Sequence, residues 1–330
     1  MLPRISGPPA RPRPPARGRT ARPGCCTLAC RMLAAIALLL AATLQASWSV
    51  PPSANPPHSA AIPPPTPVSS HASIEVQGAP RQGGALFLTV RDAVHNATTR
   101  IHWLNRDWPV GVEDEDEVRT VVPIAVYVKP GVHELALYTD GKVVASASVR
   151  VVKHAYPHGE IRLPRAMLAT YLTPRARAED RRILDAAAVF LPRRYWHGNF
   201  VVPAAGPLGT RFGIQRTYNG WYHAYHHGID IEAWGGSAIR AANAGVVTVV
   251  SHHMLVNGSA TLINHGFGVS SLYLHQSHQN VRPGQAVWKG EVIGRVGMTG
   301  AGTGPHLHWA CYVDGIPVDP EVLMHVPTGW

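Results

Sequence analysis

The stretch HHGIDIEAWGG, residues 226–236, indicates how the C-terminal part of the chain folds and where its chemistry lies. A glycine at its third position is unfavourable in a helix, and isoleucines on both sides of Asp230 give the alternation of a strand. Side chains two and four positions apart share one face of an extended chain. We therefore expect His226 and Asp230 to point to the same side, and His227 to the opposite side.

A second stretch, GPHLHW at residues 304–309, carries two histidines with the same alternation. In a strand, His306 and His308 share one face, and the apolar residues between and after them face the core. Two such strands can bring His226, Asp230 and His308 to one point, and three nitrogen or oxygen ligands suit a catalytic zinc ion with a fourth position open to water. Either pair alone is commonly incidental. Their joint appearance beside glycine turns favours a metal site, although the chain has no H-E-x-x-H helix motif.

The remainder of residues 198–330 is glycine-rich and predicts short strands joined by tight turns. It leaves no room for long helices, so we expect a mainly β domain built on an antiparallel sheet. The expected strands lie within residues 237–253, 259–275 and 285–300.

Residues 73–153 predict a separate, small β-sandwich-like domain. Short runs rich in β-branched and aromatic residues alternate with turn signals such as Asp140-Gly141. The acidic run Glu113–Glu117 is expected to be a solvated loop rather than a cation site. The expected strands are residues 85–92, 99–104, 122–128, 133–140 and 142–153.

Residues 154–197 are predicted to connect these two domains. Within them, residues 174–191 carry Ala, Leu, Arg and Glu with apolar side chains at helical spacing, and Pro174 suits a first helical turn. We therefore expect a helix whose apolar stripe packs on a neighbouring domain rather than forming a binding surface.

Residues 1–49 indicate a signal peptide or an N-terminal membrane anchor. Seven arginines precede or border the apolar run Met32–Leu44. This run, at about 13 residues, is too short for an ordinary transmembrane helix but suits a signal peptide. Residues 50–72 are proline-rich and predict an extended linker. We therefore expect an exported protein of the periplasm or cell envelope, either anchored to the inner membrane or secreted.

Charge and cysteine content limit the classes of partner. The formal net charge is +10, but residues 1–31 contribute +7 of it, so the remainder gives little electrostatic reason to expect nucleic acid as a partner. Three cysteines precede the apolar run, which leaves Cys311 alone beyond it and predicts no internal disulfide. We expect Cys311 to be a small buried apolar residue.

Several motifs together resemble the lysostaphin/LytM-type zinc metallopeptidases: TRFGIQ, HHGIDIEAWGG, NHGFGVSSLYLHQ, VRPGQAVWKGEVIGRVGMTG and TGPHLHW. The resemblance spans about residues 198–320, in the order and spacing of the family. It implies a duplicated hybrid motif of antiparallel β-structure, and hydrolysis of peptide bonds in peptidoglycan cross-links or stem peptides. The preceding β domain and helix also resemble the accessory region of some bacterial members.

The resemblance implies a role for each of five residues. His226, Asp230 and His308 match the family's ligands for one Zn²⁺ ion. His306 and His275 match the two histidines near the zinc-bound water, where one accepts the proton of the water and the other stabilises the oxyanion. We assign His306 as the base and His275 as the stabiliser, although the sequence alone does not divide these roles.

Some residues keep two interpretations. Tyr273 shares the expected strand face of His275, so it either helps to bind substrate or packs in the core. Trp221, Tyr222 and Trp234 form either aromatic walls of a cleft or core packing. The N-terminal β domain either positions the enzyme, covers its cleft or binds a regulatory protein.

Two other classes of function compete with the peptidase. One is a non-catalytic relative that activates another cell-wall hydrolase, although such relatives typically lack some zinc ligands. The other is a carrier domain of the lipoyl or sugar-phosphotransfer kind, because the stretch VRPGQAVWKGEVIG is similar to the hairpins of such domains. Lys289 in that stretch lacks the usual context for cofactor attachment, and Asp230 and the export signal also count against it. The sequence therefore favours an exported zinc endopeptidase with peptidoglycan peptides as substrate.

Overall fold

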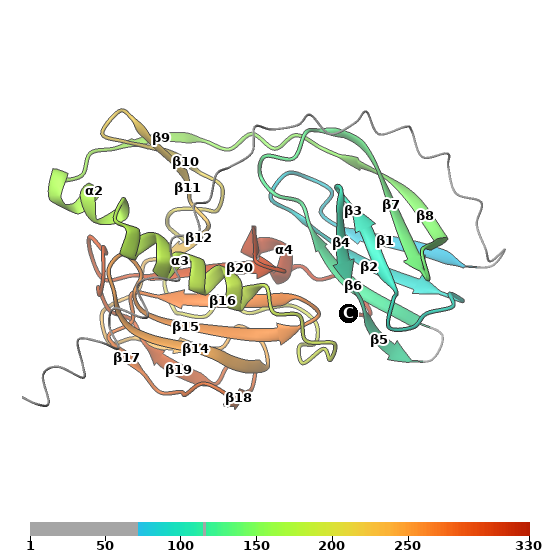
Figure 1. Cartoon of the computed structure of the whole chain (residues 1–330). Helices are drawn as coiled ribbons and strands as arrows, with labels where there is room; N and C mark the ends of the chain where they lie inside the picture. The colour runs from blue at the N-terminus through green and yellow to red at the C-terminus, as the bar shows by residue number, and fades with distance from the viewer. Residues whose placement is uncertain (1–71, 115–116) are drawn as a thin grey trace, which may run out of the picture. The chain divides into compact units, whose positions relative to one another are not determined.

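The computed structural model describes residues 72–114 and 117–330, shown in Figure 1. The signal or anchor predicted at 1–49 and the linker predicted at 50–72 lie outside these residues, apart from residue 72. Within the described ranges, no helix is long and apolar enough to cross a membrane. The prediction of a mainly β fold is confirmed, because strands far outnumber helices along this part of the chain.

Two four-stranded antiparallel sheets form the N-terminal part of the described chain. One has the order β1-β2-β6-β5 and the other the order β4-β3-β7-β8. Residues of both sheets share one apolar core that includes Leu88, Trp103 and Leu137, as expected for a sandwich. The strands are β1 (Ser73–Gly78), β2 (Ala85–Arg91), β3 (Arg100–Trp103), β4 (Arg106–Pro109), β5 (Gly111–Asp114), β6 (Glu117–Pro123), β7 (Gly131–Thr139) and β8 (Lys142–Val151).

The prediction of a strand at residues 122–128 is wrong. β6 begins earlier and ends at Pro123, and the segment after it contains a turn in which Tyr127 is exposed. Proline has no N–H to donate to the ladder, so it often stands where a strand ends. The apolar run alone did not show this boundary.

The described ends of the acidic run at residues 113–117 lie in strands, so the expectation of a loop is wrong for these ends, and residues 115–116 lie outside the described residues. These ends belong to β5 and β6, which pair with each other. Glu113 binds Arg194 (Oε1–Nε 2.7 Å), and Glu117 binds Arg91 (Oε2–Nε 3.1 Å). These ion pairs let the acidic side chains occupy strands, because arginines from elsewhere in the chain offset their charge.

The helix predicted at residues 174–191 is confirmed as α3 (Pro174–Ala187), although it ends earlier than predicted. Thr173 caps it, because its Oγ1 accepts a hydrogen bond from the Ala176 backbone N–H at 3.1 Å. The apolar stripe packs against the sheet of the C-terminal region, with Ile183 buried in a shared apolar cluster. Figure 1 shows α3 lying across this sheet beside β16.

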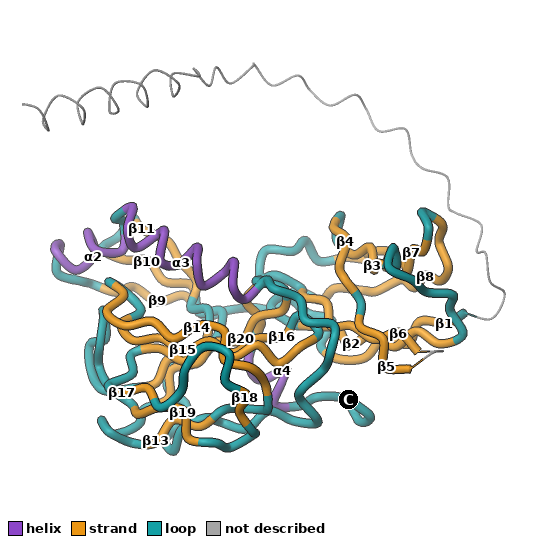
Figure 2. Tube along the Cα trace, turned by 60° about the horizontal axis from the view of Figure 1, so that its bottom comes forward, coloured by secondary structure: helices purple, strands orange, loops and turns teal. Residues whose placement is uncertain are grey.

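The connector also contributes a strand to the C-terminal region. β9 (His158–Ile161) pairs in parallel with β10 (Gln215–Tyr218), which pairs antiparallel with β11 (Tyr222–Tyr225). The short helix α2 (Arg165–Tyr171) follows β9 and was not predicted. Figure 2 shows α2 and α3 beside these three strands.

A seven-stranded antiparallel sheet forms the centre of the C-terminal region. Its order is β12-β20-β16-β15-β14-β18, and β21 pairs with β20. In this register, Asp230 lies opposite His308 on one side and Leu274 lies opposite His308 on the other. Trp309 and Cys311 enter the main core, and Cys311 is buried as predicted. The strands are β12 (Gly228–Ile231), β14 (Gly245–Met254), β15 (Gly258–Gly266), β16 (Val269–Leu274), β18 (Ala286–Val287), β20 (Leu307–Val313) and β21 (Ile316–Val318).

A smaller sheet and a last helix complete the C-terminal region. The sheet has the order β13-β19-β17, and the helix packs beside β20. The main core also takes in sandwich residues, since Phe87 meets Trp330 edge to face at 5.3 Å between ring centroids. The elements are β13 (Ala238–Arg240), β17 (His278–Gln279), β19 (Val292–Arg295) and α4 (Pro320–Met324).

Candidate metal and active site

Three predicted ligand residues meet at the edge of the central sheet. His226 stands just before β12, Asp230 lies on β12 and His308 lies on β20. Their ligand atoms all lie within 4.8 Å of one another. The Asp230 Oδ1 atom is 3.0 Å from His226 Nε2 and 2.9 Å from His308 Nδ1. The antiparallel register produces this meeting, because it sets Asp230 directly opposite His308.

The approach of the two strands depends on a glycine. A Cβ atom at Gly228 would lie 2.4 Å from the Trp309 carbonyl oxygen and 2.9 Å from His308 Nε2. Any larger residue would push β12 away from β20 and from the ligand ring. The glycine that ruled out a helix in the sequence is therefore also required for the site.

The donor set fits a zinc ion. His226 Nδ1 lies 2.9 Å from the Arg211 carbonyl oxygen, which can only accept, so Nδ1 carries the hydrogen and Nε2 presents a lone pair to Asp230. A nitrogen lone pair beside a carboxylate oxygen is favourable only when a positive charge lies between them. Zinc ligands at about 2.0–2.1 Å in a tetrahedron are about 3.3 Å apart, close to the 2.9–3.1 Å separations of these three atoms.

Asp230 and His308 have the protonation states that metal binding needs. Burial would raise the pKa of Asp230, but its close contacts with the rings of His226 and His308 lower it overall, so the group stays ionised. Burial also lowers the pKa of His308 to about 4, which leaves its ring neutral at neutral pH. The second oxygen of Asp230, Oδ2, faces Arg216, whose Nη2 is 3.6 Å away. Sequence reasoning missed Arg216, because nothing in its local pattern distinguishes it from a surface arginine.

The two other predicted histidines lie beside the ligands. His306 stands just before β20, and its Nε2 is 3.9 Å from Asp230 Oδ1. The ring centroid of His275 is 4.7 Å from that of His306 and 6.3 Å from that of His308. Burial, and then the nearby His308, lower the pKa of His275 to about 4. All five residues predicted from the sequence are thus brought together.

Backbone carbonyls orient both of these histidines in the same way. His306 Nδ1 donates to the Gly304 carbonyl oxygen, and His275 Nδ1 donates to the Thr299 carbonyl oxygen, each at 2.8 Å. In each ring, Nε2 is therefore the free nitrogen. When the ring is neutral this nitrogen accepts a proton, and when the ring is protonated it donates one.

Strand alternation does not explain the position of His275, and the expectation for Tyr273 changes with it. β16 ends at Leu274, and His275 has a φ of +62°, which departs from the strand and turns its side chain to the cleft. Tyr273 is fully buried in the core, where its hydroxyl oxygen accepts hydrogen bonds from the Ala242 N–H and the Ser271 hydroxyl at 2.8 Å each. The alternative of substrate binding by Tyr273 is therefore wrong.

The five residues lie in a cleft of about 670 Å³. One wall comes from the connector, with Met167 and Tyr171 of α2 and Ile183 of α3. Another comes from β10 and β11, with Arg216 and Tyr222. The described residues of the sandwich do not line this cleft, which argues against the hypothesis that the sandwich covers it.

The aromatic residues with two interpretations behave differently from one another. Tyr222 lines the cleft, which confirms the first interpretation for this residue. Trp221 and Trp234 are 58% and 88% exposed, so core packing is wrong for both, and neither lines the cleft. Trp221 instead borders a second hollow on the other face of the β9–β10–β11 sheet.

Comparison with known proteins agrees with this geometry. Residues 224–320 match the model of Peptidase family M23. A DD-carboxypeptidase/endopeptidase, Mpg, of Neisseria meningitidis is 44% identical over 103 residues, which cover 31% of this chain and 23% of that protein. The peptidoglycan DD-endopeptidase ShyC of Vibrio cholerae is 39% identical over 98 residues, covering 30% of this chain and 22% of that protein. The chain thus spans less than a quarter of the length of these curated relatives.

A solved structure extends the likeness beyond the matched region. The crystal structure of a putative peptidase M23 from Pseudomonas aeruginosa has a TM-score of 0.57 and 26% identity, and the match covers 74% of this chain and 95% of that one. Such coverage includes more of the chain than the family model does. Residues 224–320 therefore form a Peptidase family M23 domain of the LytM/lysostaphin type.

Proposed function

We propose that this protein is an exported zinc endopeptidase that hydrolyses peptide bonds in peptidoglycan. The observation that carries the proposal is the meeting of a three-donor metal set and two further histidines in one cleft. The names of the M23 relatives, which include a DD-carboxypeptidase/endopeptidase and a peptidoglycan DD-endopeptidase, support the class of substrate. The predicted signal or anchor at residues 1–49 supports a place in the periplasm or cell envelope.

His226, Asp230 and His308 would hold the metal ion through one atom each. A bound zinc ion supplies a Lewis acid and makes a coordinated water acidic near neutral pH. His226 is buried and the other two ligand side chains are partly buried, and the Arg211 carbonyl fixes the ring of His226. These residues would therefore hold the metal ion and take no part in proton transfer.

His306 and His275 would move the protons. A neutral His306 accepts a proton at Nε2 from the attacking water, and its bond to the Gly304 carbonyl keeps the ring turned towards the site. His275 faces the cleft from the end of β16 and would stabilise the oxygen of the scissile carbonyl as this oxygen becomes negative. The protonated ring then returns a proton to the amine that leaves. Since both rings share one orientation, this division of roles stays a prediction.

The test is digestion of defined peptidoglycans by the full zinc-loaded chain. New amino and carboxyl termini, identified by mass spectrometry, should mark a cleaved peptide bond, and the His306→Ala variant should release product far more slowly. A wild-type protein that bound zinc stoichiometrically but released no peptide from any purified wall type would overturn the proposal. Binding to another cell-wall hydrolase, and stimulation of it by a zinc-free protein, would favour the activator instead.

A further inference from the structure

A second hollow, of about 890 Å³, lies against the opposite face of the β9–β10–β11 sheet from the cleft. Successive residues of β10 divide between the two spaces, because Arg216 and Tyr218 line the cleft whereas Thr217 lines the hollow. Ile161 and Leu163 line both spaces. The two spaces are therefore neighbours at the end of β9.

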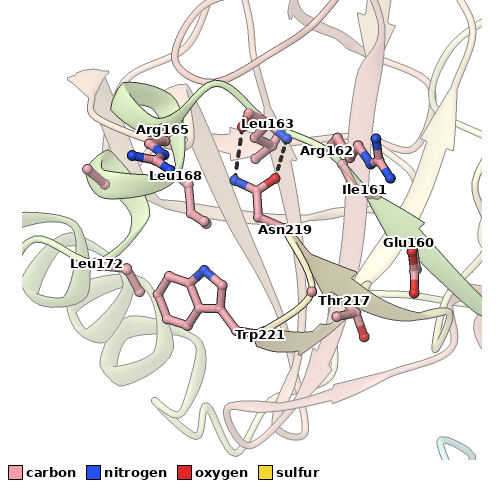
Figure 3. Close-up of a pocket in the computed structure, with 12 residues that line it drawn as sticks. Glu160, Ile161, Arg162, Leu163, Arg165, Leu168, Leu172, Thr217, Asn219 and Trp221 are labelled. Atoms are coloured by element: carbon pink, nitrogen blue, oxygen red, sulfur yellow. Dashed lines mark hydrogen bonds between the residues drawn. The ribbon is translucent and has the colours of Figure 1, made fainter.

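One side chain ties the turn between β10 and β11 to the segment that follows β9. Asn219 has a φ of +51° at the turn between β10 and β11. Its Nδ2 donates to the Leu163 carbonyl oxygen at 3.0 Å, and its Oδ1 accepts from the Leu163 N–H at 2.8 Å. Figure 3 shows this pair of hydrogen bonds at the side of the hollow. These two bonds fix the Leu163 backbone at this side of the hollow.

Trp221 offers an aromatic face to this hollow. Its side chain is 58% exposed, and Figure 3 shows the indole beside Leu172, below Leu168 of α2. Burying an indole normally stabilises a fold, so a tryptophan left open beside two leucines offers contact area to a ligand. The C–H face of a sugar ring is the natural partner of such a flat, electron-rich surface, and binding sites commonly combine an apolar wall with a few polar groups.

Two unpaired arginines border the same space. Arg162 and Arg165 line the hollow, and neither side chain has an ion-pair or hydrogen-bond partner among the described residues. A guanidinium group binds a carboxylate through two parallel hydrogen bonds. The single acidic side chain of the hollow, Glu160, leaves the balance positive. The hollow therefore suits a ligand that joins a sugar ring to an acidic group.

We propose that this hollow binds an N-acetylated sugar of the glycan strand, next to the acidic peptide that enters the cleft. The sugar ring would lie on Trp221, and a carboxylate of the attached peptide would bind Arg162 or Arg165. This inference rests on the proposed function, because peptidoglycan is a polymer in which each acidic peptide is joined to such a sugar. It assigns a second contact with substrate outside the matched M23 region, formed largely by α2 and β9.

The test compares two substrates with and without sugar. Cross-linked disaccharide-peptide dimers from muramidase-digested peptidoglycan are one substrate, and the same dimers after an amidase has removed the sugars are the other. The quantity compared is kcat/KM for the dimers with sugar divided by kcat/KM for the dimers without sugar. Trp221→Ala should lower this ratio about fivefold to tenfold, the size of one aromatic contact. Trp221→Phe should keep most of the ratio. Trp288→Ala, at an exposed tryptophan that lines neither space, should keep the wild-type ratio.

Binding separates failure of this inference from failure of the proposed function. Uncross-linked disaccharide-tetrapeptide is titrated calorimetrically into the full wild-type chain, the Trp221→Ala chain and an Arg162→Ala/Arg165→Ala chain. Weaker binding in both variants, without cleavage of dimers by the wild type, would support the hollow and overturn the endopeptidase. Cleavage with an unchanged substrate ratio in Trp221→Ala would overturn the hollow and leave the endopeptidase intact. Absence of any wild-type binding would also overturn the hollow.

Discussion

The floor and the outer wall of the cleft are built in different ways. The floor consists of β12 and β20, where strand register sets Asp230 opposite His308. The wall consists of connector segments such as α2 and α3, which precede the matched M23 region and reach the cleft only through packing. Strand pairing therefore brings the candidate metal ligands together, whereas contacts between distant segments place the residues of the wall.

The largest expected effects come from the two histidines of the floor that stand one residue apart. His308→Ala should lose stoichiometric zinc and with it the endopeptidase activity, because an N/O site with two ligands no longer holds the ion. His306→Ala should keep zinc and lose about 10²–10⁴-fold in kcat, the usual size of a proton-transfer contribution. Mass spectrometry measures the zinc content of each variant, and turnover of a cross-linked peptide measures its activity. Equal loss of zinc in both variants would contradict the division between ligand and base.

A second effect separates histidines that serve the fold from those that serve the cleft. His265 is fully buried, its Nδ1 donates to the Ala244 carbonyl oxygen at 2.7 Å, and burial lowers its pKa to about 4. An unfolded histidine binds a proton near pH 6.5, so the unfolded state gains the proton first and stability falls as pH drops from about 6.5 to 4. The loss should reach about 3 kcal/mol by pH 4.

Urea unfolding of the zinc-free protein at several pH values measures this loss. The His265→Gln variant should be less stable at pH 7 but should show a shallower fall with pH than the wild type. The same fall in both proteins would assign the pH dependence to other groups. His278→Gln is the matched control, since that histidine is exposed.

A third effect lies where the floor meets the wall. Arg216 on β10 faces Oδ2 of Asp230, the oxygen that does not meet the histidine nitrogens. Arg216→Gln should weaken zinc binding about 10–100-fold, as is usual when a partner that orients a metal ligand is removed. Competition with a chromophoric chelator gives the affinity without reference to turnover. Arg240→Gln, at an exposed arginine that lines no part of the cleft, should leave it unchanged.

The floor could be predicted from the sequence, and the wall could not. Alternation placed Asp230 and His308 correctly, because each strand has a buried face and a one-residue slip would expose its apolar residues. It does not apply to His226, which lies before β12, and the expectation that His227 points away is wrong, since His227 also lines the cleft. The same rule fails at His275, where a left-handed residue ends the regularity of β16. Resemblance to a family, rather than alternation, identified that histidine.

The wall depends on contacts that a linear pattern does not contain. The pairing of β9 with β10 joins residues more than fifty positions apart, and α2 has too few residues for its periodicity to be read. Trp221 illustrates the consequence. Whether its side chain lies in the cleft, in the core or at the surface depends on where the connector packs, and the local sequence does not show this. The prediction of a strand at residues 122–128 was wrong for a related reason, since composition alone did not show where β6 ends.

The smallest expected effect tests whether the connector is part of the substrate site at all. Tyr171 of α2 lies half-buried in the cleft wall, 6.0 Å from Tyr218 between ring centroids. Tyr171→Ala should raise KM for a cross-linked peptide about threefold to tenfold and lower kcat less, because the ring contacts substrate away from the reacting bond. Tyr127→Ala, at an exposed tyrosine of the sandwich, is the control and should change neither constant. If Tyr171→Ala lowered kcat and left KM unchanged, the connector would act on the histidines of the floor, and the separation of floor from wall would be wrong.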